Sequence, residues 1–230
     1  ALPAWAQERI ERWYAMEMMG QRAGWMHEIT ETKDGIITSN TESRMQLARG
    51  ALKMTIEMDS TFVETAEGKP ISMRSRQMLG AGEVVQEFAF TDTGVTQITT
   101  QGGKRSEKTA PRPEGEWLTP DAARRFFTQR FKSGAAEISV RTIDPQNGLT
   151  PANTKYAKFE PTTITIGDRK IDGKKCEVEI SIPPGVKSVE VLDSDLARSG
   201  AQGNPINVVG ANDLPVIAAV GATASYTENA

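Results

Sequence analysis

Residue types that could carry catalytic chemistry are scarce in this sequence of 230 residues: Cys176 is the only cysteine and His27 the only histidine. A cysteine nucleophile needs a base such as histidine within hydrogen-bond reach. Cys176, however, alternates with apolar residues, as a residue on the buried face of a strand does, and those residues are Val178, Ile180 and Ile182. Buried cysteines are mostly inert, and His27 also lies on a partly apolar stretch. We therefore expect both residues to be structural.

Other constellations of catalytic or ligand-binding residues are equally weak. A lone cysteine excludes an intrachain disulfide and a zinc site of several thiolates. The acidic groups Asp92, Asp168/Asp172 and Asp193/Asp195 sit beside Gly, Lys or Arg, where turn chemistry explains them, and none has EF-hand spacing. No nucleophile elbow, dinucleotide fingerprint or P-loop occurs. The sequence thus predicts no catalytic residue, no cofactor site and no metal site.

The elements that would position any site follow from a period-two alternation of apolar and polar residues, which is typical of strands with one buried face. In the clearest stretch the apolar positions are Leu52, Met54, Ile56, Met58 and Phe62. The preceding stretch has Ile37, Met45 and Leu47 on one face. A turn at 49–50 lies between the two stretches, which therefore predict a hairpin of unusually long strands. Short connections at 20–24, 67–70, 80–82 and 92–94 extend this hairpin to a β-meander.

One helix is predicted at about 119–133. Thr119 is a suitable N-cap, Pro120 suits the first helical position, and Ser133-Gly134 ends the pattern. The aromatic stripe of this helix, Phe126, Phe127 and Phe131, is expected to pack on the apolar face of the sheet. Strands resume at 137–143, 155–166, 175–182 and 186–192, with a turn expected at Asp172-Gly173. The predicted fold is mainly β: one long-stranded, curved, half-barrel-like antiparallel sheet with one amphipathic helix on its apolar face.

We expect residues 7–199 to form a single antiparallel β domain. Residues 1–6 contain Ala4-Trp5-Ala6, the small-x-small pattern of a signal-peptidase site. We interpret them as the remnant of an export signal, which predicts a periplasmic or cell-envelope location; an ordinary helix start is the alternative. Residues 200–230 form a Gly-rich tail with one candidate closing strand at 214–220.

Charge and hydropathy exclude two classes of function. The 27 basic and 30 acidic residues are spread along the chain and give a net charge of -3. This balance offers no electrostatic footprint for nucleic acid and no polybasic membrane anchor. The mean hydropathy is -0.43, and no apolar run approaches the ~20 residues of a membrane-spanning helix. We expect neither a nucleic-acid partner nor a transmembrane segment.

An apolar stripe on the predicted strands is the one candidate ligand-binding feature. Its residues are Tyr14, Met16, Met18, Met54, Ile56, Met58 and Phe62. If the helix covers only part of a curved sheet, this stripe would hold an apolar ligand. If the phenylalanines of the helix cover it fully, the stripe is the protein core. Both interpretations stay open at the level of the sequence.

Two stretches resemble a known family. The first is Trp13-Tyr14-x-Met16-x-x-x-Gly20-Gln21-x-x-Gly24-Trp25-x-His27, and the second runs from Ile164 through Cys176-Glu177-Val178 to Val191-Leu192-Asp193-Ser194-Asp195 and Arg198. They resemble the opening and closing strands of the β-rich region that precedes the catalytic domain in secreted bacterial transglutaminase-like proteins. That region is similar to the curved sheets of periplasmic lipoprotein carriers. No motif of the transglutaminase triad matches, so no catalytic residue is carried over to this chain.

These observations lead us to expect a non-catalytic, exported binding or accessory domain of the cell envelope, with a catalytic domain elsewhere in a longer protein left open. A protein or peptide partner would use an exposed sheet edge or the polar face of the sheet. The alternative is a periplasmic carrier that holds lipid or another apolar molecule in the concavity of the sheet. An enzyme in its own right is the third hypothesis.

Overall fold

A computed structural model of the chain describes most residues of the β region. The described ranges are 8–18, 21–49, 52–80, 82–166, 169–182, 186–193, 213–214, 216–218 and 227–228. The chain divides into two compact units. The first comprises residues 1–11, 27–121 and 143–151, and the second comprises 12–26, 122–142 and 152–230.

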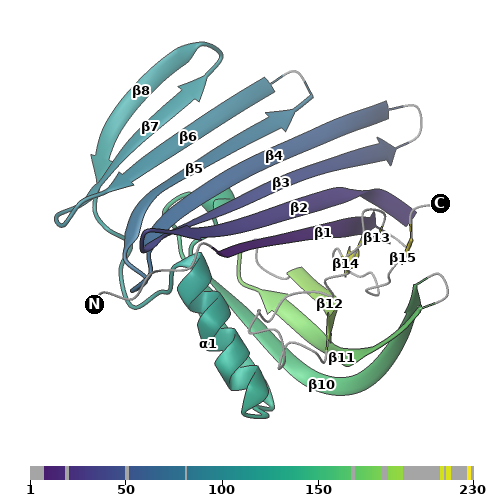
Figure 1. Ribbon diagram of the computed structural model, residues 1–230. Helices are drawn as coiled ribbons and strands as arrows, with labels where there is room; N and C mark the ends of the chain where they lie inside the picture. Colours follow the sequence, from purple (N-terminus) through teal and green to yellow (C-terminus); the bar gives the residue numbers. More distant parts are fainter. Residues whose placement is uncertain are drawn as a thin grey trace. The chain divides into compact units, whose positions relative to one another are not determined.

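Consecutive long strands build the larger sheet (Figure 1). They are β1 (Glu8–Met18), β2 (Gln21–Lys33), β3 (Ile36–Arg49), β4 (Leu52–Thr65), β5 (Pro70–Leu79), β6 (Gly82–Phe90), β7 (Val95–Gln101) and β8 (Lys104–Ala110). These eight antiparallel strands lie in the sheet in chain order, and the sheet is not closed into a barrel. The predicted mainly-β, antiparallel class is thus confirmed.

The β3–β4 hairpin has the long strands that the alternation predicts. Its register runs without interruption from Ile36↔Thr65 to Arg49↔Leu52. On β4 the even-numbered side chains share one face because successive residues of a strand point to opposite sides. We call this the Phe62 face, made by Met54, Ile56, Met58, Ser60, Phe62 and Glu64 of β4 together with their register partners on β3 and β5.

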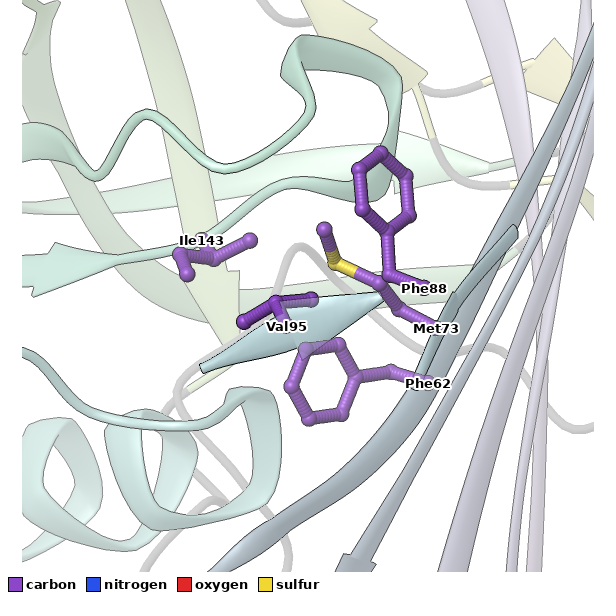
Figure 2. Packing of buried hydrophobic residues seen from close by; sticks show 5 residues of the cluster. All are labelled: Phe62, Met73, Phe88, Val95 and Ile143. Atoms are coloured by element: carbon purple, nitrogen blue, oxygen red, sulfur yellow. The ribbon is translucent and has the colours of Figure 1, made fainter. Parts of the chain in front are cut away.

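The core of the first unit lies at one end of the Phe62 face. Figure 2 shows its buried cluster, which consists of Phe62, Met73, Phe88, Val95 and Ile143. Four of these side chains come from β4, β5, β6 and the start of β7, and Ile143 comes from a segment that contains the short helix η1 (Pro145–Asn147). Phe90, Trp117 and Leu149 pack around the cluster. Sequence-distant segments therefore complete this core.

The second unit contains most of helix α1 (Pro120–Lys132) and a separate four-stranded sheet. The sheet has the order β12-β11-β10-β9, with β9 (Glu137–Thr142), β10 (Ala152–Ile166), β11 (Arg169–Ile180) and β12 (Val186–Asp193). The single predicted sheet is thus two, since the strands after the helix pair among themselves. The ring centroid of Phe127 lies 4.6 Å from that of Tyr156 on β10, and Phe131 contacts Phe159 of the same strand. This second sheet therefore receives two of the three predicted phenylalanines, whereas Phe126 is exposed.

A β-bulge in β10 allows the sheet to meet two successive turns of α1. The register with β11 shifts between Ala157 and Glu160, and Lys158 takes a positive φ of 56°. The extra residue changes which side chains face the helix. Tyr156 before the bulge contacts Phe127, and Phe159 after it contacts Phe131 at 5.5 Å between ring centroids.

Two predicted turns are wrong in position. Asp172 and Gly173 lie inside β11, which begins at Arg169 and pairs with Ile166 of β10. β2 already begins at Gln21, so Gly24 is a strand residue. In both places pairing with a neighbouring strand continues through residues of types that are common in turns, so the strand is longer than predicted. Residues 1–6 lie outside the described residues, as does most of 200–230.

Three short strands are described within that tail: β13 (Asp213–Leu214), β14 (Val216–Ala218) and β15 (Thr227–Glu228). β14 falls within the predicted closing strand and pairs in parallel with β1, with Ala15 opposite Val216. The C-terminal segment therefore adds a strand to the larger sheet, next to β1.

Candidate functional site

Cys176 has the environment of a core thiol. It is fully buried, at 0% exposure, next to the equally buried Val178 on β11. Burial, together with the negative charge of Glu190, raises the pKa of the thiol far above its ordinary value. A thiol in this state stays protonated at neutral pH and is a poor nucleophile. Its surroundings match the structural role expected from the alternation of the sequence.

His27 belongs to a cluster of charged side chains on β1 and β2 of the first unit. Its Nε2 atom lies 2.9 Å from Glu11 Oε1. Arg9 donates to Glu11 at 3.1 Å and to Glu31 at 3.3 Å. The hydrogen bond with His27 is the main cause that lowers the pKa of Glu11. The hydrogen bond to the Glu11 carboxylate therefore fixes the orientation of the His27 imidazole ring on the sheet.

A shallow, open depression of about 310 Å³ adjoins this cluster. Its lining residues are His27, Ile29, Asn40, Thr41, Glu42, Asp59, Ser60 and Thr61. The register pairs Asn40 with Thr61 and Glu42 with Asp59, which places these four side chains on the sheet face opposite Phe62. Thr61 donates to Asn40 Oδ1 at 2.8 Å. The lining thus combines polar groups of β3 and β4 with apolar surface, and it includes Ile29 beside His27.

The candidate acidic groups do not assemble into a metal site among the described residues, where no cluster of three or more potential ligands is found. Asp172 accepts a hydrogen bond from Thr163 at 2.6 Å. Asp92 is exposed beside the β6–β7 turn. Asp168 and Asp195 lie outside the described residues. In the same part of the chain, no helix has both the length and the apolar character that membrane crossing requires.

The predicted apolar ligand face is graded from buried to exposed along β4. Phe62 is 2% exposed and belongs to the core. Ile56 and Met58 are half-buried, and Met54 is 39% exposed. Leu79 of β5, which pairs with Ile56, is 53% exposed. The side chains of Tyr14, Met16 and Met18 lie outside the described residues, although β1 contains all three.

Glu64 is the residue of structural consequence that the sequence analysis missed. It follows Phe62 on the same face of β4 and is completely buried. Its Oε1 accepts the backbone N–H of Asp121 at 2.8 Å, and its Oε2 accepts the Thr119 hydroxyl. Glu64 thus caps the first turn of α1 from a distant strand. The sequence signal for this role is a glutamate on β4 at a position where the alternation calls for an apolar residue.

No family model, curated protein or solved structure matches this chain.

Proposed function

We propose that the chain is a non-catalytic, exported binding module of the cell envelope, and that a protein or peptide partner adds at strand β8. The observation that carries the proposal is the exposure of this strand. β8 ends the order of the larger sheet, and its residues from Lys104 to Thr109 are exposed on both faces. All seven of its register pairs are made with β7, so its other edge offers backbone N–H and C=O groups for an added strand.

The charges on β8 favour an acidic extended partner. Arg105 pairs with Glu107 of the same strand at 3.1 Å. Lys104 and Lys108 lie on the other face of β8 and are exposed. Lysines on an edge strand oppose pairing between two copies of the same strand because like charges would meet. A peptide with acidic residues at alternate positions would instead place its carboxylates opposite both lysines.

Backbone NMR titration with a short extended peptide of alternating Glu and Thr tests this proposal. We expect amide shifts that are confined to β7 and β8. They should be lost in the Lys104→Glu/Lys108→Glu protein and with a peptide in which Lys replaces Glu. A matched Lys155→Glu/Lys158→Glu protein, changed in the second unit, should still bind. Shifts that spread over both sheets, or none at millimolar peptide, would contradict a binding edge at β8.

A second function, carriage of an apolar molecule, is favoured by the graded exposure of the Phe62 face. Met54 and Leu79 leave apolar surface in water at the end of β4 and β5 away from the core. Burying such surface in contact with a ligand is favourable by about 25 cal/mol per Å². The half-buried Ile56 and Met58 continue the apolar row from this open end as far as Ser60, which separates them from Phe62.

Native mass spectrometry of protein purified from its own host tests the carrier function, since a carrier should retain lipid. Binding of a fluorescent fatty acid then locates the site. Met54→Lys should weaken probe binding at least tenfold with an unchanged melting temperature, because Met54 is exposed. Met58→Lys should lower stability as well, since it puts a charge at a half-buried position. Equal probe binding by wild type and Met54→Lys would exclude this end of the sheet as the site.

A further inference from the structure

Gln146 of the short helix η1 is held in place through three of its four polar atoms. Its backbone N–H donates to Asp144 Oδ1 at 2.9 Å, and its backbone carbonyl accepts from Gln77 Nε2 at 3.0 Å. Its side-chain Nε2 donates to the backbone carbonyl of Asp59 at 3.1 Å. Because a carbonyl can only accept, the amide nitrogen and not the amide oxygen must face Asp59. These contacts fix the orientation of the Gln146 side chain.

The fourth polar atom, Gln146 Oε1, is buried and receives no hydrogen bond from the residues that the structure describes. Among those residues it is the one buried side-chain oxygen or nitrogen atom in this state. A buried acceptor without a donor is costly, and buried polar atoms in folded proteins are therefore nearly always hydrogen-bonded. The atom calls for a partner group that supplies an N–H or O–H.

Gln146 lies over the Phe62 face, where the apolar row of β4 gives way to polar residues. Gln77, which donates to the Gln146 carbonyl, is opposite Met58 in the β4–β5 register. From Met58 the apolar row runs outward to the open end of the sheet, where Leu79 is 53% exposed. In the other direction the row stops at Ser60. The unsatisfied acceptor is therefore next to the inner end of an exposed apolar row.

We propose that this part of the Phe62 face binds a neutral amphipathic molecule with a hydroxyl head group, such as a long-chain alcohol or a monoacylglycerol. The proposal rests on the carrier function above and names its ligand class. The hydroxyl donates to Gln146 Oε1, and the alkyl chain covers Met58, Met54 and Leu79. Met58 and Met54 are about 13 Å apart along the strand, which an extended alkyl chain spans. An ionised fatty acid has no donor and leaves Oε1 unpaired.

Competition against a bound fluorescent fatty acid tests the role of the hydroxyl, with dodecanol and dodecyl methyl ether as competitors for the full chain. The two molecules share one alkyl chain, but the ether has no donor. We expect the alcohol to bind about tenfold more tightly, as one hydrogen bond to a buried acceptor implies. Gln146→Leu should abolish this difference. Gln86→Leu, which changes a glutamine of the same face opposite Ser75, is the matched control and should keep it.

The outcomes separate the ligand class from the carrier function. Equal binding of the alcohol and the ether by the wild type would overturn the ligand class and leave the carrier function standing, since the apolar row alone would hold both. Displacement by neither molecule would overturn the carrier function and the ligand class together. A difference that persists in Gln146→Leu would place the hydroxyl on another acceptor and overturn the assignment to Gln146. The wild-type comparison needs no substitution, so it decides the ligand class even if Gln146→Leu is less stable.

Discussion

At the scale of single residues, Glu64 links two parts of the chain that are far apart in sequence. Both of its oxygens accept hydrogen bonds from the start of α1, and no part of the residue is exposed to solvent. A buried hydrogen-bonding group is costly when its partner is removed because the remaining group loses its solvation as well. We therefore expect the carboxylate of Glu64 to contribute more to the stability of the fold than a typical strand side chain does.

Glu64→Gln should lower the free energy of unfolding by about 1–3 kcal/mol, since the amide nitrogen cannot accept a hydrogen bond and one donor is left unpaired. Urea denaturation curves measure the change. Glu57→Gln on the opposite face of β4, where Glu57 pairs with Arg44 at 3.0 Å, is the matched control and should cost less than about 1 kcal/mol. Identical midpoints for Glu64→Gln and the wild type would contradict the capping role.

The pair of Glu11 and His27 predicts a pH effect of known sign. The hydrogen bond with His27 lowers the pKa of Glu11 below its ordinary 4.5. A lowered carboxyl pKa contributes stability above pH 4.5, and this contribution is lost as the pH falls from 4.5 through the lowered value. Glu11 is largely exposed, so the contribution is about 0.5 kcal/mol or less.

Glu11→Gln should therefore reduce stability at pH 6 slightly and leave it unchanged at the acid end of that window. Melting temperatures measured between pH 6 and pH 3 give the comparison. Glu31→Gln, which removes the other carboxylate paired with Arg9, is the control for the loss of one carboxylate from this cluster. If the melting temperature of Glu11→Gln instead fell further below that of the wild type as the pH is lowered, the predicted sign of the effect would be wrong.

At the scale of the elements, the alternation of the sequence predicts β3 and β4 well because each strand has one buried and one wet face and the β-hairpin pairs neighbours in the chain. The helix start was also predictable from Thr119 and Pro120, and α1 begins at Pro120. The second sheet was not predictable in this way, since alternation shows that a segment is a strand and not which strands pair. The apolar face at Met54, Ile56 and Met58 was equally visible, but its grading from buried to exposed depends on Ile143 and Leu149, which arrive from another segment.

The bulge in β10 is an element-scale feature with a residue-scale test. Lys158 has φ 56°, a left-handed conformation that costs an ordinary residue about 1–2 kcal/mol and a β-branched one more. Wild-type Lys158 already bears the ordinary cost, so Lys158→Ile should lower the free energy of unfolding more than Lys155→Ile does, by the additional cost of a β-branched side chain at positive φ. The control is close, because Lys155 is also an exposed lysine of β10 and pairs with Glu137 at 2.7 Å, as Lys158 pairs with Glu177 at 2.8 Å.

Thermal unfolding followed by circular dichroism distinguishes these two variants. If Lys158→Ile were as stable as Lys155→Ile, the bulge would be able to move along β10 without loss. The contact between the rings of Phe131 and Phe159 would then not require the β10–β11 register that the bulge sets. The bulge would also no longer explain why Tyr156 and Phe159, three residues apart on β10, both face α1.

At the scale of the whole molecule, the two compact units are interleaved along the chain. The first unit takes Ile143 into its core from a segment that follows most of α1, and the second takes its sheet from both sides of that segment. A cut after residue 121 would therefore remove Ile143 and Leu149 from the first core. Deleting a buried isoleucine side chain alone costs about 2–5 kcal/mol, so a fragment of residues 1–121 should lack a cooperative transition.

The fragment 7–199 should instead fold with nearly the stability of the full chain. Every described buried apolar side chain lies between Ile37 and Leu192, so both cores are retained. The fragment loses β14, which pairs with β1 over three residues, and we expect a melting temperature within a few degrees of the full chain. Differential scanning calorimetry of both proteins measures this. A much lower melting temperature would show that the tail contributes to a core, because paired backbone at the edge of a sheet is too small a contribution to explain it.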